Sequence, residues 1–264
     1  MKVFALSDIH VDFDANEQWI ADLSAFDYRD DVLILAGDVS DSVERLSISL
    51  YRLARKFRAV LYVPGNHDLW VRDRSGRSSF DKFRQLCTVV ADSGASMRTF
   101  HHGSLSIVPL LGWYDYSFGE PSEELLERWM DYRVCNWPEH MHQRDITAYF
   151  CELNRGELNV SNDTVISFSH FLPRIDVMPR FIPSDKRFLY PILGTELLER
   201  QIRQLKPKLH VYGHSHVNRR VTFDGITYIN NAFGYPNETR IAAKQLLCVH
   251  EYASRQVAAP SGRG

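Results

Sequence analysis

Residues able to bind metal ions recur in short blocks along this chain. Aspartate and asparagine offer oxygen ligands and histidine offers nitrogen, a mixture that suits manganese, iron or zinc better than calcium or magnesium alone. Glycines adjoin several blocks and let the backbone turn sharply beside a ligand. The blocks are Asp8-Ile9-His10, Gly37-Asp38 with Asp41, Gly65-Asn66-His67-Asp68, His170 and Gly213-His214-Ser215-His216.

Each block follows a short apolar run that is typical of a buried strand. The runs are KVFALSD, DVLILAGD, AVLYVPGNHD, TVISFSH and LHVYGHSH. Because strand ends on one edge of a sheet converge, we expect these distant blocks to form one cluster. In Asp-x-His and His-x-His, an extended backbone would send both side chains to the same face, so each pair should point into one pocket.

Helix-like segments alternate with these strands. They are Glu17–Ala25, Val43–Phe57, Ser79–Ser93 and Thr195–Leu205. The alternation predicts an α/β fold. Near the end, RRVTFDGITYINNA predicts a β-hairpin and LLCVHEY a last strand, so the sheets should be mixed (α+β).

Residues 1–252 are predicted to form a single domain. Within it, the aromatic-rich stretch at about 114–160 is interpreted as a helical insert packed over the core, with helices near Glu123–Tyr132 and Arg144–Leu153. The small and polar residues 253–264 are predicted to be a disordered tail.

Composition narrows the class of protein. The chain has 264 residues, is 44% hydrophobic and carries a net charge of −2, which makes extended nucleic acid an unfavourable partner. Its four cysteines are scattered, as expected of free thiols in a reducing compartment. No apolar run approaches the roughly 18 residues of a membrane span. We therefore expect a cytoplasmic protein that does not bind membranes, and its oligomeric state stays open.

The order of the blocks, D-x-H, G-D-x-x-D, G-N-H-D, a lone His and G-H-x-H, resembles the calcineurin-like metallophosphoesterase family. Together the blocks span Asp8 to His216. The resemblance implies a four-layer sandwich, with two mixed β-sheets flanked by helices. It also implies two divalent metal ions (Mn, Fe or Zn) bridged by a carboxylate and by a water or hydroxide.

The resemblance also implies roles for individual residues. The first metal would be held by Asp8, His10 and His216, the second by Asn66, His170 and His214, and both by Asp38. His67 would act as the acid near the leaving group, oriented by Asp41. The family often has Arg-Gly after that aspartate, whereas Ser42-Val43 stand here, so a phosphate-contacting arginine is missing and protein-phosphatase activity is in doubt.

Four arginines are candidate substrate ligands, because the guanidinium fork suits phosphate. The alternative for each is an ordinary solvated position. They are Arg72, Arg74, Arg174 and Arg219. Two histidine pairs are interpreted as surface or turn residues outside the site, namely His140-x-His142 and His101-His102.

The predicted function is that of a dinuclear metal-dependent phosphoesterase. It would hydrolyse a phosphate monoester of a small metabolite or nucleotide by attack of a metal-bridging hydroxide. The alternative is a phosphodiesterase acting on a cyclic nucleotide or a short nucleic acid. A non-catalytic scaffold is less favoured because every expected ligand position is filled. Ligands alone do not exclude other chemistry, such as a redox reaction.

Overall fold

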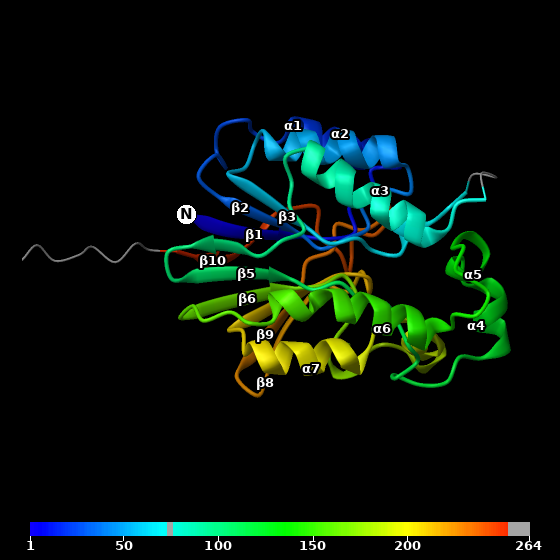
Figure 1. The fold of residues 1–264 in the computed structure, drawn as a ribbon. Helices are drawn as coiled ribbons and strands as arrows, with labels where there is room; N and C mark the ends of the chain where they lie inside the picture. Colours follow the sequence, from blue (N-terminus) through cyan, green and yellow to red (C-terminus); the bar gives the residue numbers. More distant parts are fainter. Residues whose placement is uncertain (73–75, 253–264) are drawn as a thin grey trace, which may run out of the picture.

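Two β-sheets pack face to face in the computed structural model, which describes residues 1–72 and 76–252 (Figure 1). The first sheet has the strand order β10-β1-β2-β3. Strands β1 (Lys2–Leu6), β2 (Val32–Leu35) and β3 (Ala59–Tyr62) are parallel, and β10 (Leu247–Glu251) runs antiparallel to β1. The predicted tail at 253–264 lies outside the described residues.

The second sheet has the order β4-β5-β6-β7-β9-β8. Its central strands are parallel, namely β5 (Leu105–Pro109), β6 (Thr164–Phe168), β7 (Leu209–Tyr212) and β9 (Ile226–Asn230). The edge strands β4 (Phe100–His102) and β8 (Arg219–Phe223) are antiparallel to their neighbours. Both sheets are therefore mixed, as predicted.

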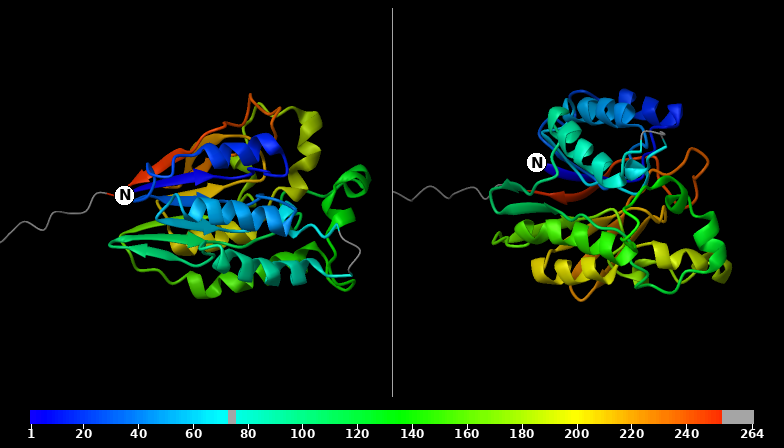
Figure 2. Two further views of the ribbon diagram at one scale, coloured as in Figure 1. Left: turned by 90° about the horizontal axis from the view of Figure 1, so that it is seen from above. Right: turned by 45° about the vertical axis from the view of Figure 1, so that its right-hand side comes forward.

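Helices cover the outer face of each sheet (Figures 1 and 2). The first sheet is covered by α1 (Asp14–Asp22), α2 (Val43–Ala54) and α3 (Ser79–Asp92), and the second by α6 (Gln143–Leu153) and α7 (Glu196–Leu205). This arrangement confirms the predicted four-layer sandwich.

The stretch predicted as a helical insert divides into two parts. Helix α6 belongs to the outer layer of the second sheet, whereas α4 (Glu123–Arg128) and α5 (Asp131–Val134) lie at the end of the molecule toward which the parallel strands point (Figure 1). Among the described residues, the connections also contain the 3₁₀ segments η1 (His67–Leu69), η2 (Asn154–Glu157), η3 (Ile175–Val177) and η4 (Ser184–Ile192).

Strand β2 shows why the strand sequences are almost entirely apolar. All four of its residues are buried. Val32 and Ile34 belong to the core between the two sheets, while Leu33 and Leu35 belong to the core beneath the helices. A strand covered on both faces has no polar face to show in its sequence.

The prediction that His101 and His102 are turn residues was wrong. They lie in β4 and pair with Ser106 and Leu105 of β5. The turn comes immediately after them, at Gly103, whose φ is 55°. A strand of three residues is too short to show an alternating pattern. Among the described helices, none is long and apolar enough to cross a membrane.

The core between the sheets yields a prediction about stability. Ile34 is completely buried there, so Ile34→Ala removes packed apolar atoms from a site that both sheets enclose. We expect the free energy of unfolding to fall by about 2–5 kcal/mol. Denaturant titration would measure it, with Ile48→Ala as control because Ile48 is 40% exposed on α2. Equal losses in the two variants would contradict this account of the core.

Candidate metal centre

Polar residues follow the strands β1, β2, β3, β6 and β7 at one edge of the sandwich. The loops after these strands bring together the seven residues expected to bind metal, although the blocks are up to about 200 positions apart in the sequence. Most of them are buried, and the His216 side chain is only 12% exposed. The seven residues are Asp8, His10, Asp38, Asn66, His170, His214 and His216.

These residues form two groups. In the first, His216 Nε2 lies 3.1 Å from His10 Nε2 and 3.4 Å from Asp8 Oδ1. In the second, His170 Nε2 lies 3.1 Å from His214 Nδ1 and 3.3 Å from Asn66 Oδ1. In each group, three nitrogen or oxygen atoms therefore lie around one position, as the coordination of a metal ion requires.

Asp38 lies between the two groups. Its Oδ2 atom is 4.0 Å from His10 Nε2 in the first and 3.6 Å from His170 Nε2 in the second. One carboxylate thus faces both groups, which is the position of a ligand shared by two metal ions. The family resemblance assigned Asp38 to both metals, and that assignment stays a prediction.

Hydrogen bonds at the outer side of three imidazoles decide which nitrogen can bind metal. His170 Nδ1 faces the Ala36 carbonyl at 2.9 Å, and His214 Nε2 faces the Ile192 carbonyl at 3.1 Å. A carbonyl only accepts, so each of these nitrogens carries the proton. His216 Nδ1 likewise faces Glu238 Oε2 at 2.6 Å. The inward nitrogens of His170 and His214 are therefore left with a lone pair for a metal. Burial lowers the pKa of His216, but Asp8 and Glu238 outweigh this effect and raise that pKa to about 10, so His216 Nε2 would release a proton when a metal binds.

Asn66 is oriented in the same way. Its Nδ2 donates to Asp131 Oδ1 at 2.9 Å, which turns the amide oxygen toward His170. Asp131 stands at the start of α5 and also accepts from the indole N–H groups of Trp70 and Trp129, at 2.6 and 2.7 Å. The segment predicted as an insert thus supplies the anchor of a metal-site residue.

The ligand-bearing backbone does not have the extended geometry that we predicted. Asp8, His10, His214 and His216 have φ values of 53°, 44°, 65° and 52°. This left-handed region is uncommon for residues other than glycine, although aspartate and histidine enter it more often than most. Such backbone costs free energy and tends to occur at functional sites, where surrounding contacts enforce it.

Two glycines, Gly37 and Gly65, allow their loops to lie close to His170 and Asp38. A Cβ on Gly37 would lie 2.5 Å from His170 Nδ1, and one on Gly65 would lie 2.1 Å from Asp38 Oδ1. Both distances are shorter than real carbon contacts, so any side chain here would displace a residue of the cluster. Gly37 also has a φ of 83°.

The chemistry of the cluster fits divalent cations. Burial, reinforced by the nearby Asp68 and Asp8 carboxylates, raises the pKa of Asp38 well above its usual range. Burial also lowers the pKa of His10 and of His214 to about 3, which leaves both rings neutral. Neutral imidazoles and nearby carboxylates are the donors that a metal ion requires. A bound cation would also offset the negative charge of the carboxylates.

His67 lies at the edge of this cluster, but Asp41 does not accompany it. The His67 ring packs against the Trp70 ring at a tilt of 30°, with centroids 3.6 Å apart, and His67 Nε2 lies 3.9 Å from Asp38 Oδ2. The Asp41 carboxylate instead pairs with Nε of Arg72. The described residues show no hydrogen bond between Asp41 and His67, so the role of Asp41 in orienting His67 stays a prediction.

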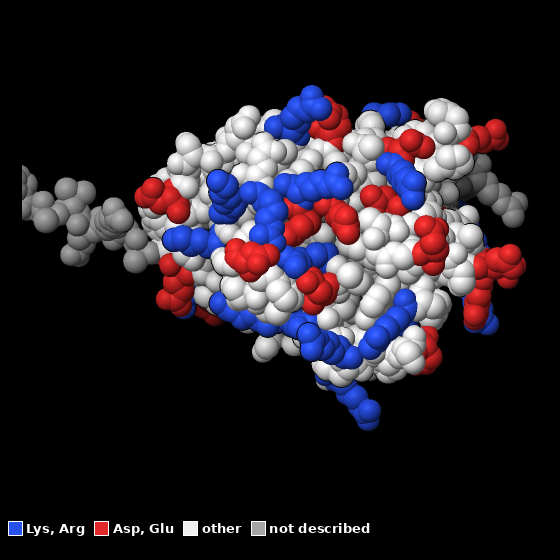
Figure 3. Space-filling view, turned by 90° about the horizontal axis from the view of Figure 1, so that it is seen from below, with Lys and Arg blue, Asp and Glu red and all other residues white. Residues whose placement is uncertain are grey.

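The other arginines proposed for substrate binding are engaged elsewhere. Arg174 donates to Asp176 and Glu199, and Arg219 donates to the carbonyls of Asp176 and Val177. Figure 3 shows positive and negative side chains interleaved on the face over α6 and α7. These contacts give Arg174 and Arg219 structural partners away from the metal ligands. Arg74 lies outside the described residues.

Three residues of the site were missed in the sequence. Glu238 and Asp131 orient metal-site residues, and Tyr235 packs its ring 4.5 Å from that of His10. None belongs to a block of metal-capable residues, so spacing could not reveal them. Asp68, by contrast, adjoins the Gly-Asn-His block and accepts four backbone N–H groups, from Asp38, Val39, Ser40 and Gly65.

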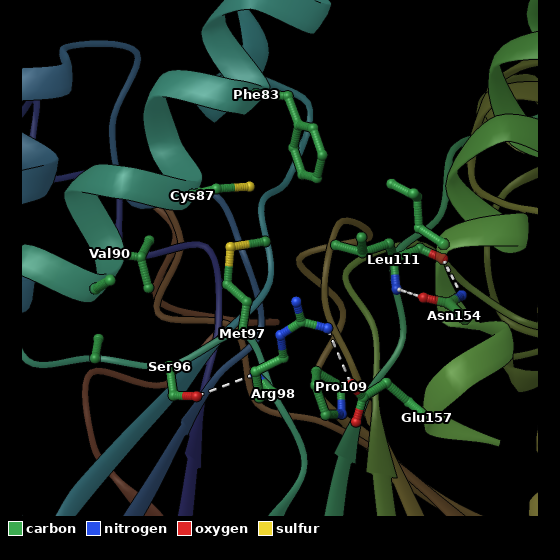
Figure 4. Close-up of a pocket in the computed structure, with 13 residues that line it drawn as sticks. Phe83, Cys87, Val90, Ser96, Met97, Arg98, Pro109, Leu111, Asn154 and Glu157 are labelled. Atoms are coloured by element: carbon green, nitrogen blue, oxygen red, sulfur yellow. Dashed lines mark hydrogen bonds and ion pairs between the residues drawn. The ribbon is translucent and has the colours of Figure 1, made fainter. Parts of the chain in front are cut away.

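A separate apolar cavity of about 370 Å³ lies between α3 and the segment that follows α6 (Figure 4). Phe83 and Cys87 of α3 face Met97 and Leu111 across it, and Arg98 pairs with Glu157 beside them. The residues that line it include none of the metal-site residues. A cavity of this volume could hold a small molecule, but the groups able to do chemistry are at the strand ends.

Two groups of buried ligands that share a carboxylate, at the strand ends of a two-sheet sandwich, define the dinuclear metallophosphoesterase class. Residues 1–218 match the model of the calcineurin-like phosphoesterase family, so the chain belongs to that family. It is accordingly a metal-dependent phosphoric ester hydrolase that uses divalent metal ions, and Asp8, His10, Asp38, Asn66, His170, His214 and His216 would hold them.

One protein of Mycobacterium tuberculosis resembles this chain both in sequence and in fold. The [acyl-carrier-protein] phosphodiesterase PptH of Mycobacterium tuberculosis is 29% identical to this chain, over 90% of this chain and 79% of that protein. The crystal structure of phosphopantetheinyl hydrolase (PptH) from Mycobacterium tuberculosis superposes with a TM-score of 0.73 at 24% identity. That match covers 91% of this chain and 93% of the other, and it shows a shared fold.

The geometry predicts that metal binding and turnover can be separated. Asp38→Ala should reduce the content of both metals, because both groups share this carboxylate. His67→Ala should lower kcat by about 10²- to 10⁴-fold while the metal content stays near that of the wild type. Elemental analysis beside kinetics would measure this, with the exposed His140→Ala as a control. Equal metal loss in the first two variants would refute the division of roles.

The hydrogen bond from His216 to Glu238 yields another prediction. Glu238→Ala removes the acceptor that holds the His216 proton on Nδ1, so Nε2 is no longer reserved for metal. We expect the affinity for added Mn²⁺ to fall about 10- to 100-fold. Metal titration by calorimetry would measure it, with Glu251→Ala as the matched control because the Glu251 side chain is 70% exposed. Unchanged affinity would mean that Glu238 has no part in the metal site.

Proposed function

We propose that this chain is a phosphodiesterase that removes a phosphopantetheinyl group from an acyl carrier protein. The observation that carries the proposal is the pair of potential metal-binding groups that face Asp38, in a chain that resembles the acyl-carrier-protein phosphodiesterase PptH over 90% of its length. The preference for a monoester stays an untested prediction, and the phosphodiesterase alternative is the one that the relative supports.

The reaction would be a hydrolysis. Water adds its oxygen to phosphorus, the bond between phosphorus and one ester oxygen breaks, and the departing oxygen receives a proton. Bound divalent metals would lower the pKa of water and offset the charge of the phosphate. The seven metal-site residues would fix the positions of those metals, and Asp68 and Asp131 would keep the ligand-bearing loops and the Asn66 amide in place.

Arg72 is the residue proposed to take over phosphate contact. The family arginine that would follow Asp41 in the sequence is absent, but the Arg72 guanidinium reaches Asp41 from another loop. Its Cζ atom also lies 4.8 Å from the centroid of the Trp70 ring, which packs against His67. The Arg72 side chain is 51% exposed, so it can turn between Asp41 and a phosphate oxygen.

Three substrates with added Mn²⁺ test the proposed function. They are an acyl carrier protein bearing phosphopantetheine, bis(4-nitrophenyl) phosphate and 4-nitrophenyl phosphate. We expect cleavage of both diesters, with free phosphopantetheine and the lighter carrier protein visible by mass spectrometry. The variants His214→Ala and His140→Ala form a matched pair, since only the first removes a ligand candidate.

Each result has a distinct meaning. Cleavage of bis(4-nitrophenyl) phosphate without any release of phosphopantetheine would exclude the carrier protein as the substrate but support phosphodiesterase activity. Cleavage of 4-nitrophenyl phosphate alone would contradict the proposed phosphodiesterase and support a phosphatase that acts on small monoesters. Hydrolysis of none of the three by a metal-loaded, folded sample would contradict the proposal as a whole.

A further inference from the structure

The loop after β9 brings an aromatic hydroxyl to the metal cluster. Tyr235 lies on this loop, and its ring centroid is 4.5 Å from that of His10 and 5.1 Å from that of His216. Its hydroxyl oxygen is 3.5 Å from His67 Nε2. The match to the family model ends at residue 218, before this loop begins, so the loop is a feature of this chain beyond the matched part.

Several hydrogen bonds fix this loop in place. Lys244 donates to three consecutive carbonyls, those of Phe233, Gly234 and Tyr235. The Gly234 N–H donates to the Asp8 carbonyl at 2.8 Å. The Tyr235 N–H donates to Glu238 Oε2 at 2.8 Å, the same oxygen that receives the His216 proton. The position of Tyr235 is therefore coupled to that of a metal ligand and does not depend on ring packing alone.

An open hollow of about 440 Å³ lies beside Tyr235. Its lining residues are Phe13, Tyr235, Pro236 and Asn237, none of which carries a charge. The Phe13 and Tyr235 rings meet edge to face with centroids 5.5 Å apart, and Phe13 is 44% exposed. An uncharged wall with one amide suits an uncharged alcohol substituent, and the open side leaves room for a larger molecule that carries it.

We propose that this hollow binds the departing alcohol of the diester and that the Tyr235 hydroxyl donates a hydrogen bond to the ester oxygen that leaves. The inference rests on the proposed phosphodiesterase function and names a specificity site for it. A phenol is protonated at neutral pH and can therefore act as a donor. It stands beside His67, the residue expected on the leaving-group side, so both groups face the same ester oxygen.

The alternative is that Tyr235 only packs against His10. A packing role requires the ring and not the hydroxyl, and Tyr235→Phe keeps the ring. The test compares metal-loaded wild type, Tyr235→Phe and Phe13→Ala on bis(4-nitrophenyl) phosphate and on diphenyl phosphate, whose phenoxide leaves less readily. Tyr51→Phe is the matched control, because Tyr51 is exposed on α2.

For Tyr235→Phe we expect kcat/KM on diphenyl phosphate to fall about 10- to 100-fold with unchanged metal content, because one donor to the developing charge is lost. The loss on bis(4-nitrophenyl) phosphate should be several-fold smaller, since a good leaving group depends less on that donor. Phe13→Ala should raise KM for both diesters and leave kcat within about 2-fold, as expected of a residue that binds the alcohol in both the ground and transition states.

Three outcomes would overturn the inference. Equal losses on the two diesters, or no loss, would place the hydroxyl away from the leaving oxygen. Loss of metal in Tyr235→Phe would make its role structural. An unchanged KM in Phe13→Ala would remove the hollow from the binding site. If the wild type hydrolyses neither diester, the proposed function itself fails and this inference fails with it.

Discussion

The Asp68 carboxylate connects the two loops on which the rest of the site depends. It accepts backbone N–H groups from Asp38, Val39 and Ser40 after β2 and from Gly65 after β3. Burial raises the pKa of Asp68 to about 6 even with these bonds, so the loops are held by a carboxyl group that has little contact with water. Asp38 and Asn66 lie on the two connected loops. The Asp68 contact therefore sets the position of the residue proposed to bind both metals and of a residue proposed to bind the second.

Around that anchor, acceptors on the outside of the cluster set the orientation of the ligands on the inside. A backbone carbonyl holds the outer nitrogen of His170, another holds that of His214, and Glu238 holds that of His216. Asp131 does the same for the Asn66 amide. The inward nitrogens of His170 and His214 and the inward oxygen of Asn66 are thereby acceptors, which a cation can satisfy. Strained backbone at Asp8 and His10 is the cost of this convergence.

The surroundings of the cluster come from segments that differ in kind from the sandwich. Helix α5 provides Asp131, and the loop after β9 provides Tyr235 and Glu238. These segments lie outside the strand-end blocks but contact Asn66, His216 and His10. The sandwich therefore supplies the metal-site residues, while these segments supply the groups that orient or pack against them.

The sequence by itself determined most of the strands, most of the helices and the blocks of metal-capable residues. Buried strands leave apolar runs, and glycines beside aspartate and histidine mark the loops that follow them. For example, the sequence predicts a helix at Val43–Phe57, and the structure has α2 at Val43–Ala54. These features are local, so neighbouring residues are enough to show them.

Only the tertiary structure decided which distant groups meet. It paired Asp41 with Arg72 instead of His67, gave Arg174 and Arg219 partners of their own, and brought Glu238 to His216. It also replaced the expected extended ligand pairs with left-handed backbone. Such outcomes depend on how loops from separate strands pack against one another, and hydrogen bonds between groups far apart in the chain leave no periodic trace in the sequence.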